Sequence, residues 1–352
     1  MTKISRQPAA LPHTGVATFC KSPYVFETES VNADDVNVDV AILGVPFDSM
    51  TSMRPGCRQA PRALRDASGR FGWLGAPADS PGFYEIGDNA KYMPNVRMID
   101  AGDVDVRLDA TEARERITAH ARSLVDRGVM LASIGGDHSI SFPLIAAFGR
   151  FDPLTIILVD AHLDYRDTSQ GLLYTNNSPF RRAHELSFVK RIVTIGARGM
   201  KSTDREYRES LEHGNLIFPM ERIHEIGVTA VIEEIGEIAN YYLSLDIDGL
   251  DPSVAPGTES PEADGLTFRQ AKQLFRGLSN KGRLVGVDIV EVNPYLDHAE
   301  LTQHIAVQLL LEAIASGFPS SPNPELRTTG HSSHLGKHFR DGGITKKSES
   351  DD

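Results

Sequence analysis

Cysteine is scarce in this sequence, which has only Cys20 and Cys57 among its 352 residues. Two thiols cannot build a disulfide framework, so a reducing compartment is expected. The first residues lack the apolar core of a signal peptide. No apolar run approaches the roughly 20 residues that span a bilayer. We therefore expect a cytoplasmic protein with no membrane partner.

Basic residues are outnumbered by acidic ones. The chain has 36 Lys and Arg against 48 Asp and Glu, which gives a formal net charge of -12. An acidic surface disfavours binding to nucleic acid and to anionic membranes. We expect no nucleic-acid partner, and the charge is compatible with a small cationic substrate.

Apolar runs typical of buried parallel strands alternate with segments of helical periodicity. The strands are predicted at residues 38–48, 96–100, 129–134, 154–160, 191–196, 241–246 and 284–292. The helices are predicted at residues 110–128, 141–151, 230–240, 268–278 and 301–318. This alternation predicts a single α/β domain in which helices cover both faces of a mostly parallel sheet.

The two ends of the chain differ from this middle part. Residues 1–37 are polar and rich in proline, so we interpret them as an N-terminal arm, and residues 38–318 as the catalytic domain. Residues 319–352 contain few apolar residues, which predicts a flexible polar tail. The three histidines of this tail are interpreted as solvated side chains: His331, His334 and His338.

Histidine and carboxylate side chains follow several of the predicted strands. In open parallel sheets, ligands bind at the carboxyl ends of the strands. The candidate residues at these ends are His138, Asp160, His162, Asp164, Asp246, Asp248 and Glu291. We expect these side chains to meet at one edge of the sheet.

The spacing of these residues favours a metal site. In an extended segment, alternate side chains point the same way, so Asp160, His162 and Asp164 would share one side. Closely packed carboxylates repel one another unless cations neutralise them, and two divalent ions would do so while activating a shared water. One such motif could equally be a turn with a core histidine, but several at successive strand ends favour metal binding. Ligands without thiolate suit Mn, Ni, Co, Fe or Zn.

Four sequence blocks resemble the signatures of the ureohydrolase family of arginases and agmatinases. They are GGDHS (residues 135–139), DAHLD (160–164), SLDIDGLDPSVAPGTESPE (244–262) and DIVEVNP (288–294). Residues 44–65 are similar to the agmatinase branch, and the whole resemblance covers residues 38–318. It implies an arginase-like fold with about eight strands and hydrolysis of a guanidino C–N bond. It also implies two divalent ions, Ni or Mn, per subunit and assembly as trimers or hexamers.

The resemblance also implies roles for single residues. One metal would be held by His138, Asp160, Asp164 and Asp246, and the other by Asp160, His162, Asp246 and Asp248. Glu291 would bind the guanidinium through a charge-assisted pairing, although a surface carboxylate is the simpler interpretation. Asp164 or Asp248 would pass a proton to the leaving nitrogen. Asp137 would orient His138 or its loop, and Cys57 would be structural.

The stretch Tyr-Thr-Asn-Asn-Ser-Pro-Phe at residues 174–180 departs from the family pattern. Agmatinase-like enzymes carry a His-Gly-Thr-Pro-Phe loop there, and Asn176 takes the place of that histidine. An amide cannot titrate, so Asn176 and Asn177 are predicted to bind substrate rather than shuttle protons. Alternatively, the change is neutral and His184 substitutes for the missing imidazole.

The altered loop predicts a compact substrate, such as free guanidine or a substituted guanidine or biguanide like metformin. Aromatic residues of the N-terminal arm would close the space that an aminobutyl chain needs: Phe19, Tyr24 and Phe26. Agmatinase activity is the alternative within the family.

Two further interpretations stay open from the sequence. A deacetylase of related fold would use a single zinc ion. A partner subunit that only stabilises an active paralogue in a hetero-oligomer would lack activity alone.

Overall fold

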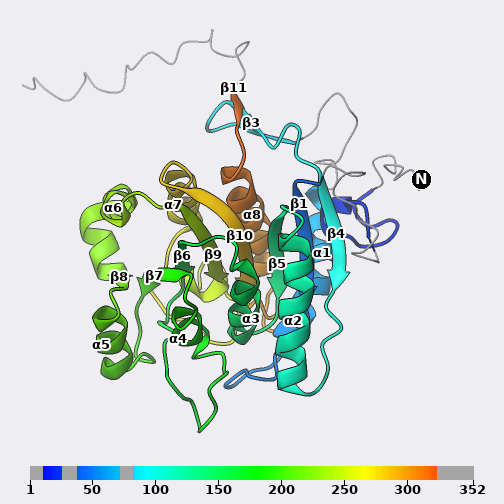
Figure 1. Cartoon of the computed structure of the whole chain (residues 1–352). Helices are drawn as coiled ribbons and strands as arrows, with labels where there is room; N and C mark the ends of the chain where they lie inside the picture. The colour runs from blue at the N-terminus through cyan, green and yellow to red at the C-terminus, as the bar shows by residue number, and fades with distance from the viewer. Residues whose placement is uncertain (1–10, 26–37, 72–81, 323–352) are drawn as a thin grey trace, which may run out of the picture.

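A computed structural model describes residues 11–25, 38–71 and 82–322 (Figure 1). Eight strands form one parallel sheet in the order β4-β1-β5-β10-β9-β6-β7-β8. They are β1 (Val40–Val45), β4 (Met98–Asp103), β5 (Met130–Gly135), β6 (Leu154–Val159), β7 (Val189–Ala197), β8 (Leu216–Pro219), β9 (Asn240–Asp246) and β10 (Arg283–Val290). The predicted fold class, a three-layer α/β domain around a mostly parallel sheet, is confirmed.

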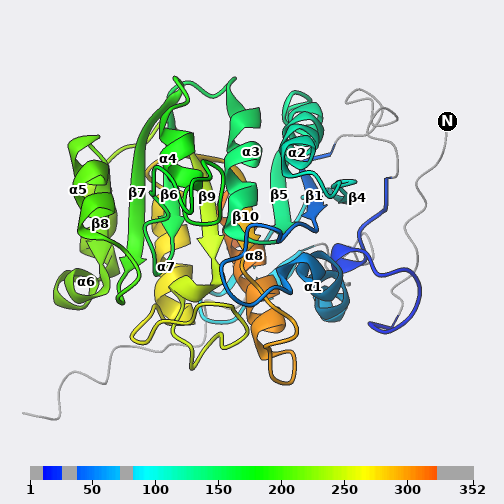
Figure 2. The same ribbon diagram turned by 90° about the horizontal axis from the view of Figure 1, so that it is seen from below.

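Helices cover both faces of this sheet, as Figure 2 shows. One face carries α2 (Ala110–Val125), α3 (Ser141–Ile145) and α4 (Pro179–His184), and the other carries α1 (Ala60–Ser68), α6 (Met220–Ile235), α7 (Phe268–Leu278) and α8 (Leu301–Ser316). α5 (Asp204–Glu212) lies beside β8. The strands β1, β5, β6 and β9 are almost wholly buried, because each is covered by apolar side chains on both faces.

A separate small sheet is built from β2 (Phe83–Glu85), β3 (Ala90–Tyr92) and β11 (Ser321–Pro322). It is joined to the helical layer by ion pairs, since Lys272 of α7 contacts both Glu85 and Glu312 of α8 at 2.7 and 3.1 Å.

Most predicted elements are present, but one helix was placed wrongly. The periodicity predicted a helix at residues 230–240, whereas α6 spans Met220–Ile235. Gly227 interrupts α6 with a φ of 76°, and Gly236 ends it with a φ of 73°. Both dihedrals are ones that glycine adopts without strain. α5 was not predicted, although Thr203 and Glu206 form a capping box at its start.

The described part of the N-terminal arm packs against the edge of the sheet. Phe19 is fully buried in the core, and its backbone N–H donates to Asp100 Oδ2 at 2.7 Å. Tyr24 forms a parallel bridge with Asp100 of β4. Phe26 and the three tail histidines lie outside the described residues.

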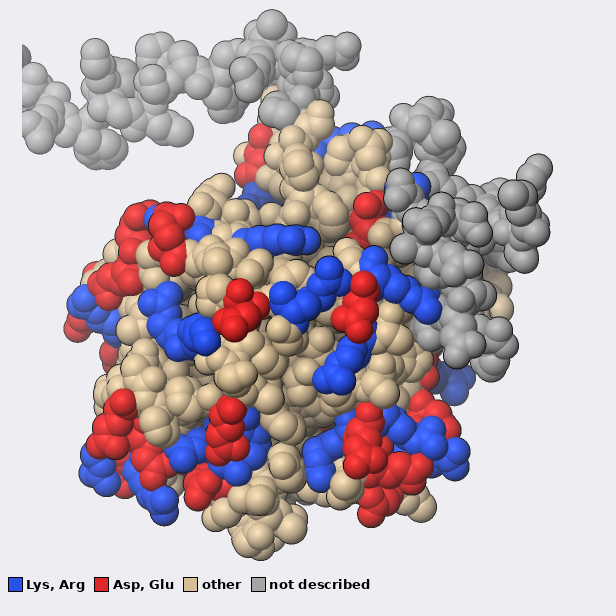
Figure 3. All heavy atoms as spheres, in the orientation of Figure 1, with Lys and Arg blue, Asp and Glu red and all other residues tan. Residues whose placement is uncertain are grey.

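On the face shown in Figure 3, basic and acidic side chains lie interspersed. Among the described helices, several ion pairs join residues one helical turn apart, such as Arg205 with Glu209 at 2.7 Å. Within the residues that the structure describes, no helix is long and apolar enough to cross a membrane.

Candidate metal centre

The candidate ligands come from four neighbouring strands in the middle of the sheet. β5, β10, β9 and β6 lie side by side in that order. His138 follows β5, Glu291 follows β10, Asp246 ends β9 and Asp160 follows β6. Because all four strands are parallel, their carboxyl ends bring these side chains to one edge, as the sequence predicted.

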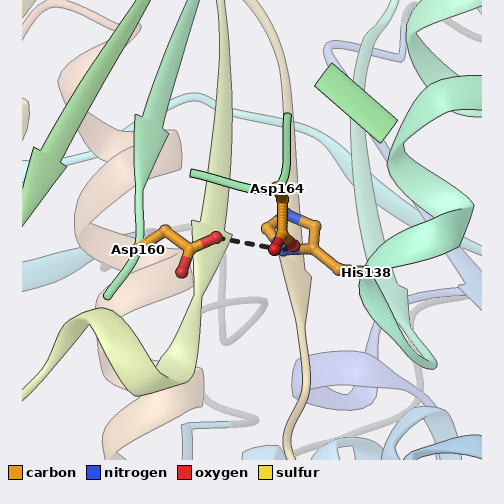
Figure 4. A group of neighbouring side chains, drawn as sticks. All are labelled: His138, Asp160 and Asp164. Carbon is orange, nitrogen blue, oxygen red and sulfur yellow. Dashed lines mark ion pairs between the residues drawn. The ribbon is translucent and has the colours of Figure 1, made fainter. Parts of the chain in front are cut away.

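The imidazole of His138 stands at the centre of three carboxylates. Its Nδ1 lies 3.2 Å from Asp160 Oδ2, 3.0 Å from Asp164 Oδ2 and 3.0 Å from Asp246 Oδ2. Figure 4 shows Asp160 and Asp164 directed toward the His138 ring. All four side chains are buried.

A second group of ligands adjoins the first. His162 Nδ1 lies 3.4 Å from Asp160 Oδ1 and 3.2 Å from Asp248 Oδ2. Asp160 therefore presents one oxygen to each histidine, and it belongs to both triads of possible metal ligands: His138, Asp160 and Asp164, and Asp160, His162 and Asp248.

These residues fit divalent ions because several of their atoms lack other partners. His138 Nδ1 and Asp160 Oδ2 are buried without a hydrogen-bond partner among the described residues. Buried polar atoms are normally paired, so unpaired atoms that converge on one point indicate a ligand. Divalent ions at this place would activate a water and polarise a guanidinium. The resemblance made Asp246 a second bridge. Its Oδ2 lies 3.0 Å from His138 Nδ1, and its Oδ1 accepts the Asp248 backbone N–H at 2.9 Å, as Asp160 Oδ1 accepts the His162 backbone N–H at 2.5 Å.

The geometric reason given for this convergence was wrong. Residues 160–164 do not form an extended strand, and Asp164 has a left-handed φ of 45°. Asp248 lies in a 3-10 helix, Ile247–Gly249. The side chains meet because tight turns at the strand ends direct them inward, and such turns are typical of functional sites.

A buried chain of hydrogen bonds contacts the His138 ring at Nε2, on the side away from the three carboxylates. Its Nε2 lies 3.1 Å from Ser244 Oγ, and Ser244 Oγ donates to Asp288 Oδ1 at 2.7 Å. Tyr242 also donates to Asp288, at 2.7 Å. With Nδ1 facing the ligand site, Nε2 carries the proton, and this chain orients the ring. Neither Ser244 nor Asp288 was predicted as a site residue from the sequence.

Asp137 orients the loop rather than the imidazole. Its carboxylate accepts the backbone N–H groups of Ser139 at 3.0 Å and Met50 at 2.9 Å. Burial raises its pKa to about 7, against the opposing effect of these hydrogen bonds.

Glu291 is buried at the end of β10, with a φ of 60°. Its Oε1 accepts the His138 backbone N–H at 2.7 Å, and Cys57 Sγ lies 3.4 Å from its Oε2. Burial raises the pKa of Glu291, and so do the charges of Asp246, Asp137 and Glu259. A carboxylate held among other anions attracts a cationic ligand.

One small cleft opens onto the ligands. Its lining residues are all polar: His162, Asp164, Asn176, Asn177, Lys201, Asp246, Asp248, Glu259, Ser260 and Glu291. Asn176 and Asn177 therefore border the site, as predicted for substrate-binding residues. Lys201, Glu259 and Ser260 were not identified as site residues, although Glu259 and Ser260 lie within the block of residues 244–262 that resembles the family.

Two other predicted contributions are not found in this cleft. His184 stacks on His213 with ring centroids 4.5 Å apart and does not line the cleft. It therefore does not substitute for the missing imidazole. Phe19 and Tyr24 pack beside β4 and do not close the substrate space.

Comparison with known proteins agrees with this geometry. The profile of the arginase family matches residues 38–316. The chain belongs to the arginase family. It is 34% identical to a guanidinopropionase of Pseudomonas aeruginosa, over 85% of this chain and 91% of that protein. It is 33% identical to a mitochondrial agmatinase of Gallus gallus, over 79% of this chain and 80% of that protein.

Solved structures of the arginase family share the fold. A proclavaminate amidino hydrolase from Streptomyces clavuligerus aligns with a TM-score of 0.74 at 27% identity, over 88% of this chain and 99% of the other. A hypothetical agmatinase from Burkholderia thailandensis aligns with a TM-score of 0.71 at 31% identity, over 87% of this chain and 90% of the other. This arginase-family member is accordingly a hydrolase of guanidino C–N bonds. The deacetylase interpretation is set aside.

Metal uptake by this arginase-family site should depend steeply on pH. Burial lowers the pKa of His162, but the charges of Asp248 and Asp160 outweigh it and raise the value to about 12 in the metal-free protein. The carboxylates likewise raise the pKa of His138 well above its usual value, against the effect of burial. Each histidine must lose its proton to bind a metal, so affinity should increase with pH.

We expect the Mn²⁺ affinity of the metal-free protein to rise by at least about tenfold from pH 6 to pH 8. Calorimetric titration in two buffers of different ionisation enthalpy would measure both the affinity and the protons released. Equal affinity at both pH values, with no proton release, would contradict the assignment of the histidines as ligands.

Proposed function

We propose that this enzyme hydrolyses a small guanidine compound, either free guanidine or a compact substituted guanidine or biguanide such as metformin. The observation that carries this proposal is the polarity of the cleft at the ligands. Every residue that lines this cleft is polar, and five of them carry carboxylates: Asp164, Asp246, Asp248, Glu259 and Glu291.

The same observation disfavours agmatine. Ligand pockets usually provide apolar walls for the alkyl parts of their ligands. The cleft lacks such a wall for an aminobutyl chain. Lys201 also borders the cleft, so its ammonium would repel the distal ammonium of agmatine.

Lys201 supports a second candidate substrate class, the guanidino acids. Its ammonium would attract the distal carboxylate of such a substrate. One relative is a guanidinopropionase and another a guanidinobutyrase, both from Pseudomonas aeruginosa. A short guanidino acid would also fit a small cleft better than a long alkylamine does.

The residues of the cleft suit hydrolysis of a guanidinium. Glu291 would pair with its N–H groups and fix the planar carbon beside the ligands. Divalent ions held by the two ligand triads would supply an activated water at neutral pH. Asp164 or Asp248 would carry the proton to the leaving nitrogen, so that water and an alkylguanidine give urea and an amine.

A substrate panel tests the proposal. The products would be measured for guanidine (urea and ammonia), metformin (guanylurea and dimethylamine, or urea and dimethylguanidine), and 3-guanidinopropionate and agmatine (urea and an amine). The enzyme would be loaded separately with Mn²⁺ and Ni²⁺. We expect kcat/KM for a compact guanidine to exceed that for agmatine by at least about tenfold, because the cleft lacks an apolar wall. A tenfold preference for agmatine would refute the proposal, and a preference for 3-guanidinopropionate would establish the second candidate.

We also propose a cytoplasmic homo-oligomer, a trimer or hexamer, that carries two Ni or Mn ions per subunit. The free, buried thiols of Cys20 and Cys57 support a reducing compartment. The alternative is a hetero-oligomer in which a paralogue supplies the activity. Light scattering and metal analysis of the purified protein, with and without such a paralogue, would decide between them.

A further inference from the structure

Glu259 is a buried carboxylate in the cleft that has no cationic partner. It is 3% exposed and lines the cleft together with Glu291. Its Oε2 accepts the Arg54 backbone N–H at 3.2 Å, and its Oε1 accepts a long hydrogen bond from Asn176 Nδ2 at 3.4 Å. Among the described residues, no side chain forms an ion pair with it.

The nearby cations are engaged with other atoms. The Arg54 guanidinium donates to the backbone carbonyls of Thr258 and Glu259. Lys201 Nζ donates to Ser260 Oγ. Glu262, by contrast, faces a metal ligand, because its Oε1 lies 3.7 Å from His162 Nε2. The carboxylate of Glu259 is therefore available to a ligand.

Burial of an unpaired carboxylate is costly, and a cationic ligand in the cleft would offset that cost. One carboxylate, Glu291, suffices to pair with the guanidine group that is cleaved. Free guanidine offers no further group, and the methylene groups of an alkylguanidine gain nothing from a second anion. The distal ammonium of agmatine would pair with a carboxylate, but the ammonium of Lys201 borders the same cleft and opposes it. A substrate with a second planar group rich in N–H donors would satisfy both carboxylates.

We propose that Glu259 is a specificity-determining residue that binds a second amidine group of the substrate, which makes biguanides the preferred class. This inference rests on the proposed function and narrows it. Glu291 holds the amidine unit that is hydrolysed, while Glu259 accepts N–H donors from the conjugated unit beside it. Asn176, hydrogen-bonded to Ser52 at 3.1 Å and to Glu259, keeps this second position in place.

The test compares Glu259→Gln, which keeps the shape and removes the charge, with Glu259→Asp, which keeps the charge. Loss of a hydrogen bond to a charged group costs roughly 10- to 100-fold in binding. We expect Glu259→Gln to raise KM for a biguanide by about that factor and to change KM for free guanidine by less than about threefold. Glu259→Asp should recover part of the loss. The exposed Glu237, whose side chain is 83% exposed, provides the matched control Glu237→Gln.

Metal content and the thermal midpoint of each variant would be measured alongside the kinetics. An equal rise of KM for guanidine and for the biguanide in Glu259→Gln would overturn the inference, because Glu259 would then only stabilise the loop that carries it. An unchanged KM for the biguanide would also overturn it. If a biguanide binds without being cleaved, its inhibition constant against guanidine hydrolysis is measured in place of KM. An inhibition constant for the biguanide above the KM for guanidine in the wild type would refute the inference. The proposed function fails separately, if the wild type cleaves no compact guanidine.

Discussion

Asp160→Asn is expected to lower kcat/KM by at least about 10³-fold and to remove both divalent ions, because metal activation of water supplies several kcal/mol. Asp160 is the residue that the two ligand triads share. Its Oδ2 faces His138 at 3.2 Å and its Oδ1 faces His162 at 3.4 Å. An amide keeps the size of the side chain but replaces one anionic oxygen with an N–H donor, which cannot bind a cation.

Metal analysis and steady-state kinetics on the same preparation would check this prediction. Asp204→Asn is a suitable control, because the Asp204 side chain is 79% exposed at the start of α5. Near-normal turnover of Asp160→Asn with two ions bound would refute the metal assignment.

Asp246→Asn provides a comparison within the site. We expect this substitution also to lose both ions, because Asp246 Oδ2 lies 3.0 Å from His138 Nδ1 while Asp246 Oδ1 lies beside Asp248 of the second site. Near-normal turnover with full metal content in Asp246→Asn would show that this carboxylate is not shared.

The sequence was sufficient to predict the layers of the fold and the convergence of the candidate metal ligands at one edge of the sheet. Buried apolar runs identified most strands, and parallel strands bring the residues that follow them to one edge. The alternating spacing of Asp160, His162 and Asp164 suggested a shared side, but the cause is a turn with Asp164 at a positive φ. A period of two cannot distinguish a strand from such a turn.

The remaining parts of the site depend on tertiary packing. Lys201 and Glu259 reach the cleft from the loops after β7 and β9. No motif marks Lys201, and the block of residues 244–262 contains Glu259 without indicating where its side chain points. Ser244 and Asp288 lie inside strands, where their small or acidic side chains interrupt apolar runs. A buried polar residue within a strand needs a partner, and that requirement was the available signal for the chain behind His138. His184 shows the opposite error, because closeness in sequence to Asn176 did not bring it into the cleft.

Glu291→Gln should lower kcat/KM by about 10²- to 10³-fold while leaving both ions bound, because it removes one charged group that stabilises the transition state. Glu291 borders the cleft but belongs to neither ligand triad. Glutamine keeps an oxygen that can accept the His138 N–H, now 2.7 Å from Oε1, so the loop that carries His138 should keep its place. The guanidinium then loses a charge-assisted pairing and faces an amide N–H instead.

Three measurements on Glu291→Gln would separate binding of the guanidinium from a structural role. Metal content should match the wild type, the thermal midpoint should change little, and kcat/KM should fall for every guanidino substrate, because all of them share the group that Glu291 holds. This uniform loss distinguishes Glu291 from Glu259, whose replacement should affect only substrates with a second amidine. Glu225→Gln, at a side chain that is 69% exposed, is the matched control. Activity within about threefold of the wild type would show that the buried carboxylate does not bind the substrate, since a lost charged hydrogen bond costs more than that. Loss of activity together with metal would instead assign Glu291 to the support of His138.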